Sequence, residues 1–334
     1  MQFNPPYLIY LGDAKDSLAA KTGQGIVDWR PEWALGQLRL PGCHADLGIP
    51  DLDVVQAAGQ GAKTLVIGTV SPGGVLPDSW SEVIVSAIEQ GMDVASGLHT
   101  RLSSLPAISE AASRKGVRLF DVRHSDRTFA IGTGELRSGK RLLTVGTDCS
   151  VGKKYAALCI ERELRARDVD ADFRATGQTG IFISGRGVSI DAVVADFISG
   201  AAEWLAPAAE PEHWDVVEGQ GSLFHPSFAG VSLGLLHGAQ PDAFVVCHEP
   251  TRRTMRNIAT AIPSVEAVIE ATINGGRLTS PMIRCVGVAI NTQLLDEAQA
   301  QKEIEAAALR LNVPVTDPVR FGVHNIVDYL LSVC

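Results

Sequence analysis

The chain has 334 residues, of which 46% are hydrophobic, 20% charged and 6% aromatic. This composition excludes a disordered chain, and the length predicts two domains of comparable size. The net charge of −9 provides no basic face for a phosphate backbone or an anionic lipid surface, so we expect neither a nucleic-acid partner nor a membrane partner. The 33 glycines exceed the usual share of about 7%, and glycine marks turns and places where backbone approaches a ligand.

The amino-terminal segment favours a cytoplasmic protein. Its apolar run, Tyr7–Leu11, is cut off by Asp13 and has no basic leader, unlike a secretory signal. No apolar stretch reaches the roughly 18 residues that a membrane-spanning helix needs. The six cysteines lie far apart without metal-binding spacing, so we expect free thiols and no metal site.

Short β-branched runs alternate with amphipathic segments, which is typical of parallel α/β sheets. In the first half, the pattern predicts strands at Tyr7–Leu11, Thr64–Val70, Met92–Ala95 and Val117–Val122 and helices at Trp80–Glu89 and Leu105–Lys115. The polar stretch from residue 124 to residue 140 lacks periodicity and indicates a domain boundary. We therefore expect a Rossmann-like α/β domain over residues 1–138.

The second half predicts its own doubly wound parallel sheet over residues 139–334. The predicted strands are Leu142–Val145, Ala171–Ala175, Val216–Val217, Ala243–Cys247, Ile283–Ile290 and Val313–Thr316. The predicted helices are Gly152–Arg167, Ile190–Leu205, Ser264–Ile273, Leu294–Leu311 and a last helix from about Asn325. Because ligands bind at the carboxyl ends of such strands, the loops after Val145, Ala175 and Val217 are the candidate sites.

The loop GTDCSVGKK carries the strongest signal, since it joins a predicted strand to a predicted helix. Small residues let consecutive backbone N–H groups converge on phosphate oxygens, and a helix amino terminus adds about 0.3–1 kcal/mol of attraction. A lysine completes the neutralisation of the phosphate charge. The alternative interpretation of this segment is an ordinary tight turn. The predicted cofactor-binding residues are Gly146, Thr147, Asp148, Cys149, Ser150, Val151, Gly152, Lys153 and Lys154.

This loop departs from the usual phosphate-binding motif in two ways. Five residues separate Gly146 from Gly152 instead of four, and Lys154 replaces the Ser or Thr whose hydroxyl coordinates magnesium. An ammonium group cannot be a magnesium ligand. The loop therefore favours a ligand that presents phosphates without reacting at them, such as coenzyme A, over Mg-ATP.

Two more glycine-rich segments follow predicted strands. Residues 174–197 contain Gln178, Thr179 and Arg186 among four glycines, which favours a ligand-facing loop over a structural turn. In the segment EGQGS, Glu218 lies at the end of a strand and is the candidate general base, although a solvated acid is the alternative. The neighbouring Gln220 and Ser222 are candidate substrate contacts.

Cys149 and His225 are weaker candidates. A helix amino terminus and lysines would stabilise the thiolate of Cys149, yet no histidine partner for a nucleophile can be identified. We interpret Cys149 as a small residue that fills the loop and His225 as a structural residue. Asp191 is interpreted first as a helix-terminus residue.

In their order along the chain, GTDCSVGKK, ATGQTGIFISGRG and VEGQGSLFHP resemble the bacterial family of D-glutamate N-acetyltransferases (DgcN-like). The motifs KTGQGIVDWR, SPGGVLP, SGLH and DVR extend this resemblance over the first half. The second domain is also similar to the P-loop fold of dethiobiotin synthetase, which uses ATP and carries a hydroxyl after its lysine. Lys154 separates this chain from that relative.

The resemblance implies acetyl transfer from acetyl-CoA to the amino group of D-glutamate, in D-amino-acid breakdown and without a metal. Glu218 would take the amine proton, and Lys153 would stabilise the oxyanion. Arg186, Arg252 and Arg253 would contact the carboxylates of the substrate. We also expect a homo-oligomer. The alternatives are an ATP-dependent ligase or kinase and a non-catalytic nucleotide-binding module.

Overall fold

The computed structural model describes residues 3–17, 19–69, 76–124 and 127–334. The chain forms two compact units: the first comprises residues 1–127 and 177–192, and the second comprises residues 128–176 and 193–334. The backbone therefore passes from one unit to the other three times. Of the motif SPGGVLP, residues 71–75 lie outside the described residues. Within the part of the chain that is described, no helix is long and apolar enough to cross a membrane.

A five-stranded parallel sheet forms the centre of the first unit, with strand order β2-β1-β3-β4-β5. The strands are β1 (Tyr7–Gly12), β2 (Ala34–Arg39), β3 (Thr64–Ile67), β4 (Asp93–Ser96) and β5 (Leu119–Asp121). Strand β1 is buried along its whole length, as expected for an inner strand covered on both faces.

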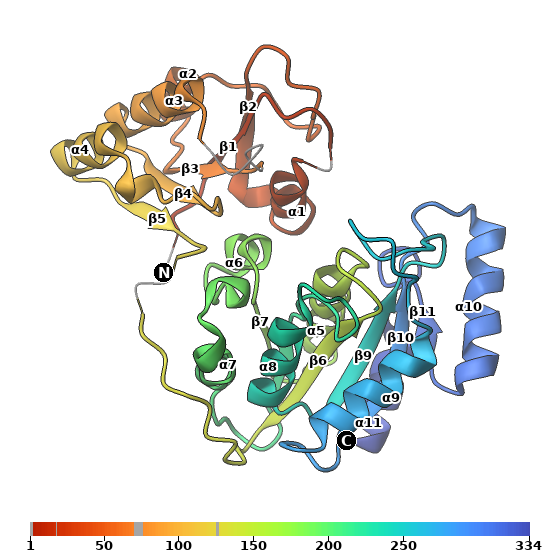
Figure 1. Cartoon of the computed structure of the whole chain (residues 1–334). Coiled ribbons are helices and arrows are strands. Elements are labelled where there is room, and N and C mark those ends of the chain that lie inside the picture. The colour runs from red at the N-terminus through yellow and green to blue at the C-terminus, as the bar shows by residue number, and fades with distance from the viewer. Residues whose placement is uncertain (1–2, 18, 70–75, 125–126) are drawn as a thin grey trace. The chain divides into compact units, whose positions relative to one another are not determined.

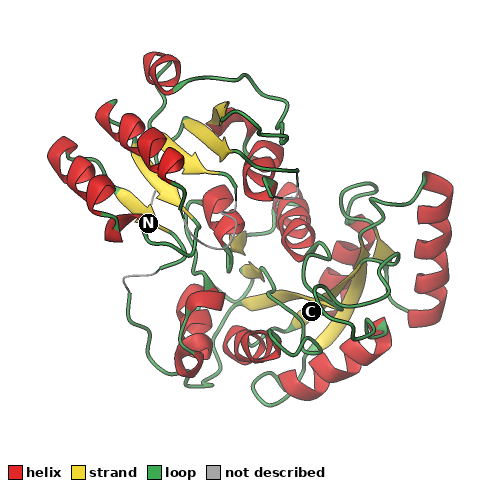
Figure 2. Cartoon of the chain, turned by 45° about the horizontal axis from the view of Figure 1, so that its top comes forward, coloured by secondary structure: helices red, strands yellow, loops and turns green. Residues whose placement is uncertain are grey.

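Helices cover both faces of this sheet (Figure 2). Leu8 and Tyr10 pack with Trp80 in one apolar core, whereas Ile9 and Leu11 face Gly23 on the other side. The first face carries α2 (Val54–Gly59), α3 (Asp78–Glu89) and α4 (Pro106–Lys115), and the second carries α1 (Lys21–Trp29) and α6 (Gln178–Ser184). Short 3-10 turns span Pro31–Trp33, Leu102–Ser104 and Ile190–Ala192.

A six-stranded parallel sheet forms the centre of the second unit, with strand order β11-β10-β9-β6-β8-β7. The strands are β6 (Lys140–Gly146), β7 (Ala171–Arg174), β8 (Trp214–Val217), β9 (Ala243–His248), β10 (Arg284–Ile290) and β11 (Val315–Thr316). The side chains of β8 and most of β9 are buried, which makes these strands the apolar centre of the unit.

Helices again form two outer layers (Figure 1). On one face, α5 (Lys153–Ala166) packs with α11 (His324–Val333); on the other, α7 (Ile198–Leu205), α8 (Ala229–Ala239) and α9 (Val265–Gly276) lie in a row. Helix α10 (Glu297–Leu311) leads into the edge strand β11, and a 3-10 turn spans Ala195–Phe197. The chain leaves β6 towards β7 and leaves β9 towards β10, in opposite directions along the sheet. Ligands bind at such a switch point, where the loops after β6 and β9 lie side by side.

The predicted fold class, two α/β units with parallel sheets, is confirmed, and most predicted elements agree with the structure to within a few residues. The continuous helix predicted over Ile190–Leu205 is wrong. Two short turns precede α7, because the chain passes from the first unit to the second after Ala192. The predicted loop after Ala175 contains helix α6, and helices α1, α2 and α8 and strand β2 are additional elements.

Candidate functional site

The loop between β6 and α5 presents backbone N–H groups for which the described residues provide no acceptor. Thr147 donates its N–H to the Cys247 carbonyl at 3.1 Å, and Ala156 donates to Gly152 at 2.9 Å. Between them, the N–H groups of residues 148–153 have no hydrogen-bond acceptor among the residues that the structure describes. Ser150 and Gly152 have φ values of 54° and 104°, and such left-handed residues turn successive N–H groups into a concave anion site.

Lys153 folds back over this loop from the first position of α5. Its ammonium group donates to the Asp148 carbonyl at 2.7 Å, and only 7% of the residue is exposed. Burial lowers the pKa of the Lys153 ammonium group, which the nearby Cys247, Cys149, Asp148 and Glu218 partly oppose. A bound anion would stabilise the charged ammonium group, which burial destabilises, so this lysine is suited to bind a phosphate group.

Glu218 lies directly after β8 and is held by Thr176, which follows β7. The Thr176 N–H donates to Glu218 Oε2 at 3.0 Å, and the Thr176 hydroxyl donates to the Glu218 carbonyl at 2.6 Å. The Gln220 amide donates to the same hydroxyl at 3.1 Å. With 5% exposure, Glu218 is a nearly buried carboxylate at the carboxyl edge of the sheet.

Gly219 brings this segment against the loop of residues 147–152 between β6 and α5, which we name the phosphate loop after its sequence motif. A Cβ atom on Gly219 would lie 1.6 Å from the Thr144 carbonyl oxygen and 3.1 Å from the δ-carbon of Lys153. The position therefore accepts no side chain, and the close approach places the residue after Glu218 beside Lys153. Ser222 also contacts the loop, since its hydroxyl donates to the Thr147 carbonyl at 3.2 Å.

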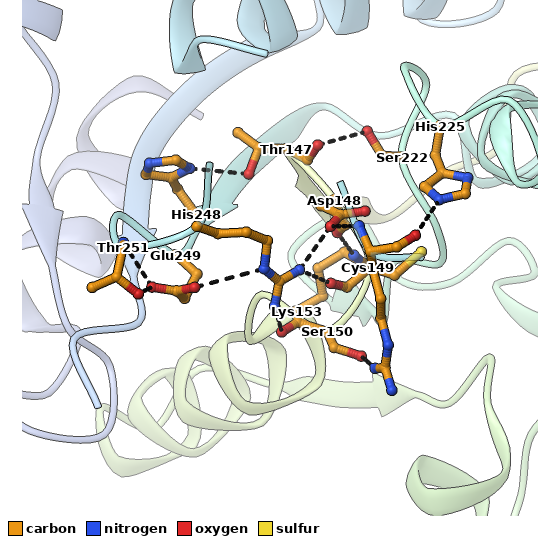
Figure 3. A network of polar contacts seen from close by, with 12 residues as sticks. Thr147, Asp148, Cys149, Ser150, Lys153, Ser222, His225, His248, Glu249 and Thr251 are labelled. Atoms are coloured by element: carbon orange, nitrogen blue, oxygen red, sulfur yellow. Dashed lines mark hydrogen bonds and ion pairs between the residues drawn. The ribbon is translucent and has the colours of Figure 1, made fainter. Parts of the chain in front are cut away.

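Arginines from the loop after β9 also bind the phosphate loop, and Figure 3 labels the residues that they contact, Asp148, Cys149 and Ser150. Arg252 donates to Asp148 Oδ2 and to the Cys149 carbonyl, both at 2.7 Å, and to the Ser150 carbonyl at 3.2 Å. The Arg256 N–H donates to Asp148 Oδ2 at 2.7 Å, and its guanidinium contacts the Ser150 hydroxyl. Asp148 is fully buried, so these contacts compensate a charge that water does not reach.

His248, at the end of β9, is a neighbour of the loop that the sequence analysis missed. Its Nδ1 lies 3.0 Å from the hydroxyl of the buried Thr147 (Figure 3). Burial lowers the pKa of His248, which favours the neutral ring. The sequence signal for His248 was its position directly after the predicted strand Ala243–Cys247. The same kind of position made Glu218 a candidate.

Cys149 and His225 have the surroundings of structural residues. Burial raises the pKa of the Cys149 thiol despite the opposing field of Lys153, which disfavours a thiolate nucleophile. His225 is 2% exposed, its Nε2 lies 3.1 Å from the Arg256 carbonyl, and its Nδ1 accepts the Ser227 N–H at 3.2 Å. Both ring nitrogens of His225 therefore have backbone partners.

The remaining predicted site residues lie in different surroundings. Gln178 and Thr179 begin helix α6 of the first unit, where the Thr179 hydroxyl lies 3.0 Å from that of Thr22. Arg186 follows α6 in the same unit and is exposed. In the second unit, Lys154 lies over the Tyr155 ring at 4.7 Å, and Arg253 is exposed. The second unit thus brings together Gly146–Lys154, Glu218, Gln220, Ser222 and Arg252.

The donor chemistry of this edge fits phosphate groups. Unused N–H groups, a buried ammonium group and the amino terminus of α5 all favour an anion. Among the described residues, no group of three or more His, Cys, Asp or Glu side chains could hold a metal ion. A parallel sheet with an anion-binding loop at its switch point defines the second unit as a P-loop domain.

The chain belongs to the DUF1611 family. Residues 129–327 match the domain of unknown function described as the DUF1611_C P-loop domain, and residues 38–125 match the DUF1611_N Rossmann-like domain. The Rossmann-like and P-loop assignments of the two halves are thereby confirmed.

Two similar proteins carry the name D-glutamate N-acetyltransferase. The one from a Pseudoalteromonas species is 49% identical over 99% of this chain and 100% of its own length. The one from Tritonibacter scottomollicae is 47% identical over 98% of this chain and 99% of its own length. A crystal structure of a DUF1611 family protein from Anabaena variabilis has a TM-score of 0.88 at 28% identity and covers 98% of this chain and 100% of its own.

Proposed function

We propose that this protein is an N-acetyltransferase that moves an acetyl group from acetyl-CoA to the amino group of D-glutamate. The acceptor and the reaction rest on the two relatives of that name, which match the chain over nearly its whole length. An N-acetyltransferase requires an acetyl donor. The choice of coenzyme A as its carrier is supported by the phosphate loop, with its unused N–H groups and buried Lys153.

The loop residues Gly146–Lys154 have the role of holding the phosphates of the donor. Lys153 and the N–H groups of the loop neutralise negative charge, whereas Lys154 stands where a magnesium-binding hydroxyl would be needed for ATP chemistry. A ligand bound through its phosphates needs no bond cleavage there. This feature favours acetyl-CoA over ATP as the ligand.

Glu218 has the role of general base. In the reaction, the amine nitrogen of D-glutamate forms a bond to the acetyl carbon, the carbon–sulfur bond breaks, and the thiolate leaves. Glu218 accepts the proton that the amine loses, and the proton finally balances the thiolate as a free thiol. A positioned base contributes about 10²–10⁴ in rate, and the contacts with Thr176 fix this carboxylate.

The carboxylates of D-glutamate require cationic or hydrogen-bonding partners. Within the second unit, the proposed contacts are Gln220, Ser222, Arg252 and Arg253, whereas Gln178, Thr179 and Arg186 of the first unit stay predictions from the sequence. Arg252 is the weakest member of this set, because its guanidinium already binds Asp148 and two carbonyls of the loop. The exposed Arg253 is the better candidate of the pair.

Release of free thiol from acetyl-CoA tests the reaction directly. D-glutamate, L-glutamate and D-aspartate are compared as acceptors, and mass spectrometry identifies the product. We expect release with D-glutamate and formation of N-acetyl-D-glutamate. Absence of release with all three acceptors would contradict the proposal.

A thermal-shift measurement separates this function from an ATP-dependent ligase or kinase. A ligand at about 100 times its Kd stabilises the native protein by roughly 2.7 kcal/mol. We expect coenzyme A to raise the midpoint of unfolding more than Mg-ATP does. Stabilisation by Mg-ATP alone would favour the ATP-using alternative.

We further propose that the protein is a cytoplasmic homo-oligomer. Light scattering would measure its molar mass in solution and so test the association.

A further inference from the structure

Arg252 touches three consecutive residues of the phosphate loop although it lies about a hundred positions later in the sequence. It binds the carboxylate of Asp148 and the carbonyl oxygens of Cys149 and Ser150. Its own loop supports this position, because Glu249 Oε2 lies 3.6 Å from the Arg252 Nε. Glu249 is in turn fixed by the N–H and hydroxyl groups of Thr251. Figure 3 labels Asp148, Cys149, Ser150, Glu249 and Thr251 within this network of polar contacts.

These contacts determine which way the loop peptides face. In a trans peptide, the carbonyl of one residue and the N–H of the next point in opposite directions. Because the Cys149 and Ser150 carbonyls point to Arg252, the N–H groups of Ser150 and Val151 point away from it. Both N–H groups belong to the set that has no acceptor among the residues described by the structure.

We propose that Arg252 is a positioning residue: its guanidinium turns the N–H groups of Ser150 and Val151 towards the phosphates of the donor. The arginine acts through the loop and does not itself touch the phosphates. A flat guanidinium suits this role, since its several N–H groups reach a carboxylate and two carbonyls at once, which a lysine ammonium cannot match. The identity of the donor rests on the proposed function, whereas the effect on phosphate binding does not.

The test compares Arg252→Met, Arg252→Lys and Arg165→Met in the full-length protein. Arg165 forms an exposed ion pair with Glu161 on α5 and serves as the control for loss of a positive charge. Calorimetry measures the Kd of inorganic pyrophosphate and of coenzyme A. We expect Arg252→Met to raise both Kd values at least tenfold, Arg252→Lys to raise them less, and Arg165→Met to change them less than twofold.

Loss of Arg252 leaves the buried Asp148 without its ion-pair partner, which can destabilise the protein by itself. The double variant Asp148→Asn/Arg252→Met removes both charges and keeps the experiment informative. We expect it to regain thermal stability relative to Arg252→Met while its Kd for pyrophosphate remains raised, because the two carbonyls still lack their donor. Recovery of wild-type affinity in the double variant would show that Arg252 only compensates the charge of Asp148 and would overturn the proposal.

Kinetics provide a second readout. With acetyl-CoA as donor and saturating D-glutamate, a positioning role raises the KM for acetyl-CoA in Arg252→Met. A lowered kcat with unchanged KM and unchanged Kd contradicts the role. If the wild-type protein binds pyrophosphate but transfers no acetyl group, the proposed function fails while the Arg252 inference is still tested. A wild-type protein that binds neither coenzyme A nor pyrophosphate contradicts both.

Discussion

Helices α1 and α5 each follow an inner strand of a parallel sheet, yet the backbone N–H groups at their amino termini are used differently. Each follows an inner strand, β1 or β6, and each begins with a lysine, Lys21 or Lys153. In the first unit, Lys21 is exposed and the Gly23 N–H donates to the Gly68 carbonyl at 2.8 Å. In the second unit, Lys153 is buried and the preceding N–H groups have no acceptor in the described part of the chain.

This difference shows that topology alone does not make a phosphate site. Both sheets offer a helix amino terminus at the carboxyl edge, but the protein uses the N–H group of Gly23 to join α1 to β3. The loop before α5 instead receives support from outside through its carbonyl oxygens, by Lys153 and Arg252. A loop held through its carbonyls keeps N–H groups for a ligand.

The largest expected effect concerns the carboxylates that end strands in the two units. Glu218→Gln should lower turnover by about 10²–10⁴, because an amide cannot accept the amine proton. The affinity for coenzyme A should change less than twofold. The matched control is Asp121→Asn, since the Asp121 carboxylate accepts three hydrogen bonds from Leu102 and Ser103 and ends β5. Free thiol release at saturating substrates measures both, and a fully active Glu218→Gln removes this residue as base.

The next effect separates the two lysines. Lys153→Met should raise the Kd of coenzyme A about tenfold to a hundredfold, since hydrogen bonds to charged groups contribute about 1.5–3 kcal/mol. Lys21→Met should leave it within twofold, because this exposed lysine begins the helix whose N–H is already used. Calorimetric titration of both variants is the measurement. Equal losses in the two variants would contradict the assignment of the site to the second unit.

Alkaline pH provides a smaller test of the same lysine. Because burial lowers the pKa of Lys153 below its ordinary value, the ammonium group loses its proton at a lower pH than that of an exposed lysine. The affinity for coenzyme A should therefore fall as pH rises through this lowered pKa, by at most about tenfold per pH unit. Titrations of wild type and Lys153→Met between neutral and alkaline pH measure the effect. Parallel curves would exclude Lys153 as the titrating group.

The same pKa shift predicts a change in stability. Between the lowered pKa and the ordinary one, the unfolded chain binds more protons than the folded chain, so the contribution of Lys153 to the free energy of unfolding rises with pH. Lys153→Met lacks this pH-dependent contribution to the free energy of unfolding. The free energy of unfolding of the variant minus that of the wild type should therefore decrease as pH rises, which chemical denaturation at several pH values would show.

The phosphate loop could be predicted from the sequence because its signals are local. The strand, the two glycines, the lysine and the helix all lie between residues 142 and 167. The position of Glu218 at the end of a strand followed from the apolar run before it, and its role as base stays a prediction. The fold class was predictable for the same reason, since alternation of strands and helices is a local pattern.

The partners of the loop could not be predicted, because they depend on the order of the strands. Arg252, Arg256 and His248 reach the loop only because β9 pairs with β6, about a hundred residues away. Helix α6 was missed because its glycines and polar residues suggested a loop, whereas Ile181 and Phe182 are buried within the first unit. No local pattern indicates that residues 177–192, which lie between β7 and β8 in the sequence, belong to the first unit.

The smallest expected effect concerns Cys149, the one thiol in the loop. Cys149→Ala should retain turnover within about twofold, because burial raises the pKa of the thiol and the loop uses the backbone of this residue rather than its sulfur. The wild-type thiol should also react slowly with iodoacetamide at neutral pH, since the thiolate is the reactive form. Mass spectrometry after alkylation and thiol release by the variant measure the two effects. Loss of activity in Cys149→Ala, together with an acetylated Cys149 in the wild-type protein, would instead establish an acyl-enzyme route. In that route the lysines of α5 activate the sulfur, so α5 would differ from α1 in catalysis as well as in binding.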